Sequence, residues 1–155
     1  MNKNGTEVSP RIMKISPYGS LNESELITLE QHIGFRLPDD YRRFLARTNG
    51  GRVENSIFHI SELDEDVLLN VFFGINVEKN KVLNLSFWFD KYRDEIPEHS
   101  LLIGNEPGGG FLLYIPYGED CGVYFYDDSY TFEQSNDDGN TYYITETFQE
   151  FIDSL

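Results

Sequence analysis

The chain has a single cysteine, Cys121, so it cannot form an internal disulfide bond. An oxidising compartment is therefore not indicated. No apolar run is long enough to span a membrane, and the polar N-terminal segment lacks the apolar core of a signal peptide. These absences predict a cytoplasmic protein without a membrane partner.

Basic residues are also scarce. The 155 residues include 12 Lys and Arg against 27 Asp and Glu, which gives a formal net charge of -15. Such a charge repels a phosphate backbone, so we expect no nucleic-acid partner, and it steers a cationic partner toward the protein. With 39% hydrophobic and 15% aromatic residues, the chain is long enough to bury the core of one domain.

The sequence has no complete motif for binding phosphate or calcium. The run GNEPGGGF resembles a Walker loop, but aligning Gly104 and Gly109 to the pattern puts Gly110 and Phe111 where lysine and a hydroxyl belong. The acidic run YDDSYTFEQSNDDGN does not match an EF-hand register, because Thr145 falls where a bidentate glutamate is required. These segments predict a glycine turn and a solvated acidic loop.

The sequence offers equally little to a nucleophilic or metal enzyme. It has no G-x-S-x-G element, and Cys121 lies in a predicted strand rather than at a helix N-terminus. His32, His59 and His99 do not stand at metal-ligand spacing. We therefore predict no catalytic residue, no cofactor and no stoichiometric metal, although carboxylates are abundant enough to leave an acid/base hydrolase as a distant third alternative.

Two helices are predicted near the N-terminus. Asn22 and Glu25 form a capping-box pattern, and the apolar face that follows ends at Gly34. In LPDDYRRFLARTNGGR, Pro38 suits the first helical position. The apolar spacing places Tyr41, Phe44, Leu45 and Thr48 on one buried face and Arg42, Arg43 and Arg47 on faces toward solvent; Asn49, Gly50 and Gly51 mark the end.

The rest of the pattern is mostly strands. SIFHI and LLNVFFG predict short strands around the acidic turn 62–66, and helical spacing returns from Val82 to Tyr92. SLLIG, GFLLYIPYG, CGVYFYD and TYYIT predict an antiparallel meander, followed by a last helix capped by Thr145. We expect an α+β fold in which this meander packs against N-terminal and C-terminal helices, with residues 1–20 as an extended or partly ordered lead-in and 21–155 as the domain.

Tyrosines gather in the predicted strands. Alternation assigns Val123 and Phe125 to one face of the sheet and Tyr124 and Tyr126 to the other, which is left open if helices cover only the first. Tyrosines beside acids suit a protein-binding surface, and cross-strand pairs that stiffen the sheet are the alternative. The binding hypothesis names these residues: Glu106, Glu119, Asp120, Tyr124, Tyr126, Asp127 and Asp128.

Several of these pieces occur in a familiar order. LPDDYRRFLARTNGG, VFFG, IPEHSLLIGNEPGGG, GVYFYD and ITETFQEFIDSL together resemble the SUKH superfamily, from about Asn22 onward. One departure is Gly109-Gly110, where the usual pattern has glycine and asparagine. The superfamily includes a fungal regulator of cell-wall glucan synthesis and bacterial immunity proteins that neutralise toxin domains, often nucleases. The resemblance implies an α+β fold and a binding role, and it supplies no catalytic residues.

The resemblance and the net charge together favour one function. We expect an immunity protein that neutralises a basic, nuclease-like toxin by direct binding. A regulatory or scaffold module that binds a cellular protein or peptide is the runner-up.

Overall fold

The computed structural model describes residues 14–136 and 139–155. Its helices are α1 (Glu23–Ile33), α2 (Asp39–Thr48), the 3-10 helix η1 (Lys81–Leu83), α3 (Leu85–Tyr92) and α4 (Phe148–Ser154). Its strands are β2 (Lys14–Pro17), β3 (Gly51–Glu54), β4 (Ile57–Ile60), β5 (Glu65–Leu68), β6 (Val71–Phe72), β7 (Leu101–Asn105), β8 (Phe111–Ile115), β9 (Gly122–Tyr126) and β10 (Thr141–Thr145). The fold is α+β, as predicted.

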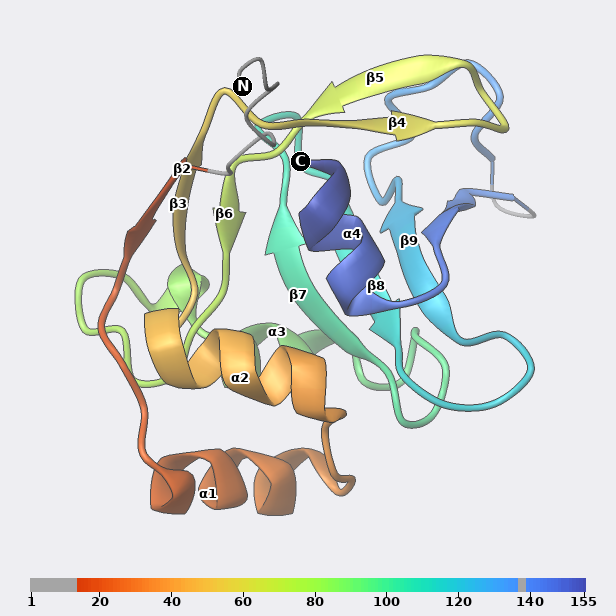
Figure 1. Cartoon of the computed structure of the whole chain (residues 1–155). Coiled ribbons are helices and arrows are strands. Elements are labelled where there is room, and N and C mark those ends of the chain that lie inside the picture. Colours follow the sequence, from red (N-terminus) through yellow and green to blue (C-terminus); the bar gives the residue numbers. More distant parts are fainter. Residues whose placement is uncertain (1–13, 137–138) are drawn as a thin grey trace, which may run out of the picture.

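Seven of the strands form one antiparallel sheet, in the order β10-β9-β8-β7-β6-β3-β2. The predicted meander is therefore confirmed as β7 to β10, and β2 places part of the lead-in at the far edge. Strands β4 and β5 pair only with each other among the described residues, and this hairpin lies across one end of the sheet (Figure 1).

Helices cover both faces of the sheet. On one face, Phe148 of α4 packs against Phe44 of α2 and Phe72 of β6, with ring centroids 5.1 and 6.0 Å apart. On the other, Trp88 of α3 packs against Phe111, whose centroid lies 4.9 Å away. In Figure 1, α4 lies in front of the sheet and α3 behind it. The condition under which Tyr124 and Tyr126 would be left open, with helices on one face only, is therefore not met.

The ends of α1 and α2 follow the predicted signals closely. Asn22 and Glu25 form the capping box of α1, and Gly34 ends that helix with φ 87°. Pro38, however, is the N-cap of α2 rather than its first residue. Asn49 ends α2 with φ 53°, and its side-chain amide bonds the N–H and C=O of Ile75, which ties the helix end to the loop after β6.

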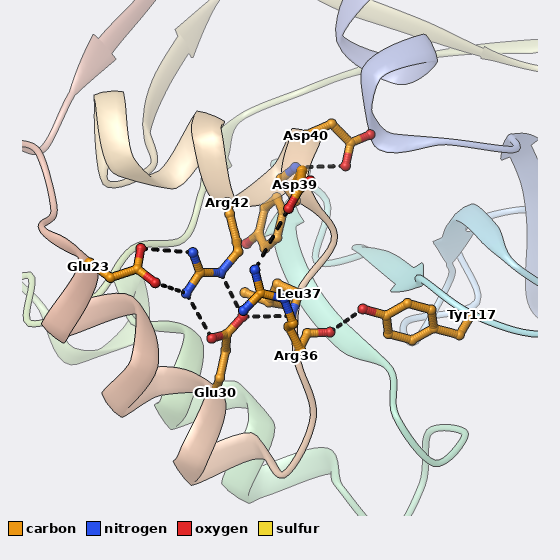
Figure 2. Close-up of polar contacts among 9 residues, drawn as sticks. Glu23, Glu30, Arg36, Leu37, Asp39, Asp40, Arg42 and Tyr117 are labelled. Carbon is orange, nitrogen blue, oxygen red and sulfur yellow. Dashed lines mark hydrogen bonds and ion pairs between the residues drawn. The ribbon is translucent and has the colours of Figure 1, made fainter.

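Arg42 corrects the prediction that it faces solvent. It is buried between α1 and α2, where its guanidinium donates to Glu30 at 2.8 and 3.0 Å and to Glu23 at 2.9 and 3.0 Å (Figure 2). The Glu30 carboxylate also accepts the Leu37 N–H at 2.7 Å, so it fixes the turn that joins the helices. Burial raises the pKa of Glu30, but the bonds from Arg42 and Leu37 outweigh it and leave that pKa below its ordinary value.

Two smaller predictions also need correction. Thr147, not Thr145, caps α4, because Thr145 still belongs to β10. The single helix predicted from Val82 to Tyr92 is divided at Asn84, whose side chain bonds both the N–H and the C=O of Val77. The helix does end before Pro97, as expected.

Truncation of Phe44 tests the core between α2 and the sheet. Its ring is buried against the rings of Tyr41, Phe72 and Phe148. We expect Phe44→Ala to lower the free energy of unfolding by ~3–5 kcal/mol, measured by urea denaturation. The exposed neighbour Arg43→Ala is the control, and a loss below about 1 kcal/mol for Phe44→Ala would contradict the packing described.

Removal of Arg42 tests the buried ion pair. Because the side chain of Glu30 is only 11% exposed, Arg42→Ala leaves a buried carboxylate without its cation, and we expect a loss of ~3–5 kcal/mol in unfolding free energy. Glu23 is largely exposed, so Glu23→Gln should change stability little. Equal losses in the two variants would show that Glu30 does not depend on Arg42.

Candidate partner-binding surface

Charge is divided unevenly along the chain. The last basic residue is Arg93, and the 62 residues that follow contain 14 acids and no lysine or arginine. This segment supplies strands β7 to β10 and helix α4. The absence of lysine and arginine after Arg93 can be read from the sequence, but the overall net charge does not reveal it. This part of the fold therefore has acids without lysine or arginine, whereas the 12 basic residues belong to the lead-in, the turn between α1 and α2, α2, β3 and the segment around α3.

Two tyrosines stand side by side on this acidic part. Tyr124 of β9 and Tyr143 of β10 are cross-strand neighbours, with ring centroids 5.6 Å apart at 78°. Tyr143 is 43% exposed, and the Tyr124 hydroxyl donates to the backbone oxygen of Asp120 at 2.6 Å. We call Tyr124, Tyr126 and Tyr143 the tyrosine face. Tyr143 lies in the predicted strand TYYIT but was not among the predicted binding residues, although its pairing with Tyr124 follows once β9 and β10 are recognised as neighbours.

The third member of the tyrosine face is partly covered. Tyr126 lies against Tyr92 of α3, with ring centroids 6.3 Å apart, and the Tyr92 hydroxyl donates to Asp128 at 2.8 Å. Burial, and then the nearby Asp128 carboxylate, raise the pKa of Tyr126 to about 12. Its phenol therefore stays neutral at physiological pH. Tyr92 was not predicted to take part, because only the fold brings α3 to this face.

Asp127 does not belong to an exposed rim. Its side chain is 0% exposed, and it accepts the N–H groups of Thr131 and Phe132 at 2.8 and 3.0 Å and the Ser135 hydroxyl at 2.5 Å. The prediction that it rings the tyrosines was wrong. A carboxylate that accepts several bonds inside the protein organises the loop after β9 instead.

Glu106 also serves its own loop. It accepts the N–H groups of Gly108 and Gly110, each at 2.7 Å, and so it shapes the glycine turn between β7 and β8. A side chain at Gly109 would come within 2.7 Å of the Ser129 hydroxyl, so this turn lies beside the residue that follows Asp128. Glu106 is therefore near the rim, with its carboxylate already engaged.

The remaining predicted acids are accessible. Glu119 and Asp120 are exposed in the turn before β9, and Asp128 is half-buried at the other end of the strand. Glu62, at the tip of the β4–β5 hairpin, also belongs to this surface, because its carboxylate accepts the Tyr143 N–H at 3.1 Å. Sequence reasoning missed it because the two residues are 81 positions apart. The structure thus brings acids to both ends of the tyrosine face and to its outer edge.

The described residues contain neither a cluster of metal-binding side chains nor a helix that could span a membrane. Across residues 14–136 and 139–155, no group of three His, Cys, Asp or Glu side chains could hold a metal ion. His32 pairs with Asp90 at 2.8 Å and His59 with Asp66 at 2.8 Å, on different elements. No helix in the described part of the chain is long and apolar enough to cross a bilayer. The surface offers contact area and charge.

Comparison of Asp127 with Asp128 tests their different roles. Asp127→Ala leaves two backbone N–H groups and the Ser135 hydroxyl without their acceptor inside the protein. We expect a loss of about 2–4 kcal/mol in unfolding free energy, measured by urea denaturation. Asp128→Ala removes a half-buried carboxylate that accepts from the Tyr92 hydroxyl and leaves no backbone N–H without its acceptor, so it should cost less. The opposite order would contradict this assignment.

The chain is similar to known proteins over most of its length. A family model described as SUKH_6, SMI1-KNR4 cell-wall, matches residues 23–152, which include every described element from α1 to most of α4. The chain is also similar to a Bacillus subtilis (strain 168) protein described as SPbeta prophage-derived uncharacterized protein YokK. The two are 29% identical over 158 residues, which cover 89% of this chain and 77% of that protein.

Proposed function

The chain belongs to the SMI1-KNR4 cell-wall family of SUKH proteins, and from this premise we propose that it is an immunity-type protein that neutralises a basic toxin by direct binding. The family is generally non-catalytic and includes immunity proteins. Such a protein acts by occupying the surface that its toxin needs, which requires affinity rather than a reactive group. The proposal places it in the cytoplasm, where a delivered nuclease would act.

One observation carries the proposal: the tyrosine face is built from strands of a segment, residues 94–155, that has 14 acids and no lysine or arginine. Tyrosine presents rigid apolar area with a polar tip, which suits the centre of an interface. Glu119 and Asp120 at the rim, together with Glu62 at the edge, give a cationic surface favourable charge contacts. A basic nuclease surface has this complementary chemistry.

The charge also accounts for how such a partner would be captured. A formal charge of -15 accelerates the encounter with a basic protein at low salt, and screening weakens this effect within a Debye length of about 8 Å at physiological ionic strength. Rim charges therefore govern association, whereas buried aromatic contacts govern dissociation.

The function is tested by capturing the partner and assaying its toxicity. Immobilised wild-type protein should retain a basic protein from its native host, and a Tyr124→Ala, Tyr143→Ala variant of equal stability should not. Expression of that partner alone in a heterologous host should arrest growth, and coexpression with the wild type should restore it. A retained partner that is harmless would instead favour the runner-up, a regulatory or scaffold module.

Kinetics with that partner test the division of roles on the surface. We expect Tyr143→Ala to raise the dissociation rate about tenfold or more, as interface aromatics typically do. Glu119→Gln with Asp120→Asn should slow association and flatten its salt dependence, while dissociation changes little. The control is Ile27→Ala, a similarly exposed apolar residue on α1. If only the control variant weakens binding, the partner docks on the helices.

A further inference from the structure

The β4–β5 hairpin has two apolar faces, and the core explains only one of them. Its inner face carries Phe58, whose ring packs between Phe125 and Phe151 with centroids 5.9 and 5.6 Å away. Strand side chains alternate, so the neighbouring residues point outward. There Ile57 and Leu68 are cross-strand partners, and they are 46% and 48% exposed. No packing within the described chain accounts for an aliphatic pair at this position.

The outer face borders a groove. A hollow of about 420 Å³ lies beside it, lined by Ile57, His59 and Asp66 of the hairpin and by Ile144, Thr145 and Ser154 of β10 and α4. A volume of this size accommodates one or two side chains. Ile57 and Ile144 supply apolar walls from two different elements. The groove is thus built where the hairpin meets the sheet.

The charge around the groove has one sign. Between Asn55 and Leu69 the chain contains four acids and no lysine or arginine, and β10 and α4 belong to the segment without basic residues. Asp66 and Asp64 lie 2.8 and 3.4 Å from the two ring nitrogens of His59, and both carboxylates are largely exposed. A cation beside the groove would meet two carboxylates, and the hairpin has no lysine or arginine to repel it.

We propose that this groove, together with the Ile57–Leu68 pair, is a second docking site, which binds a short segment of a protein partner that carries an aliphatic side chain flanked by lysines. The aliphatic side chain enters the groove and the lysines contact Asp64 and Asp66. A second copy of this chain suits the site poorly, because two molecules of charge -15 repel each other.

The groove shares no residue with the tyrosine face, but the β4–β5 hairpin contacts both. Glu62 at the hairpin tip binds the Tyr143 N–H, so a partner on the tyrosine face could extend a segment over the hairpin. This inference rests on the proposed function in one respect, which is that the partner is positively charged. It can therefore be tested with a peptide, without any toxin.

The test is a nuclear magnetic resonance titration of the whole chain, labelled with 15N, with the capped peptide Lys-Leu-Lys-Leu-Lys. We expect amide shifts at Ile57, His59, Leu68 and Ile144. Replacing both leucines of the peptide by serine should weaken binding, because the groove then takes no aliphatic group. Equal binding of the serine peptide, or shifts confined to Tyr124 and Tyr143, would overturn the proposal.

Variants of the protein give the matched comparison. Ile57→Ser with Leu68→Ser should weaken the leucine peptide about tenfold, and Ile27→Ser on α1, which is 41% exposed in the wild type, should not weaken it. Because all three residues are exposed, these variants should keep the wild-type spectrum elsewhere. Asp64→Asn with Asp66→Asn should flatten the salt dependence of binding. Concentration-dependent dimerisation of the wild type that the serine variant abolishes would assign the groove to a second copy instead.

Discussion

The fold depends on the aromatic contacts that helix α4 makes with elements from the other end of the chain. Phe148 packs on Tyr41 and Phe44 of α2 and on Phe72 of β6. Asp40 of α2 also accepts the Gln149 N–H at 3.1 Å, near the start of α4. These contacts join the two halves of the sequence across one face of the sheet. Helix α4 also contacts the β4–β5 hairpin, because the Phe151 ring packs against Phe58 with centroids 5.6 Å apart.

That closure has an electrostatic consequence. It holds helix α2, with its three arginines, on the same domain as a segment that has 14 acids and no lysine or arginine, and the acids of that segment repel one another. Some acids are satisfied inside the protein: Asp127 and Glu106 accept backbone N–H groups, and Glu30 pairs with Arg42. Glu119 and Asp120 are exposed. A cationic partner would relieve their repulsion, so the same charge that costs stability in the free protein adds to the affinity of a complex.

Features set by short sequence spacing could be predicted. The Asn22–Glu25 capping box, the αL residue at Gly34 and the alternation of Phe125 with Tyr126 depend on neighbours within a few residues. The resemblance to SUKH proteins was confirmed for the same reason, since its motifs are local elements in a fixed order.

Features that depend on distant partners could not be predicted. Arg42 looks like a surface residue until Glu30, 12 positions earlier, is placed beside it by the turn between α1 and α2. Asp127 reads as one more surface acid, because its acceptor role requires the loop after β9 to fold back on it. Tyr92 contacts Tyr126 of the tyrosine face only because α3 packs on that face of the sheet. In each case periodicity gives the face of the element but not what lies against it.

We propose that the acidic strands, rather than the helices α1 and α2, hold the partner. Hydrogen exchange of the amides, measured in the free protein and in the complex with its captured partner, tests this most directly. We predict slower exchange in the turn before β9, along the outer edge of β10 and in the β4–β5 hairpin, with α1 and α2 unchanged. Protection confined to α1 and α2 would contradict the account.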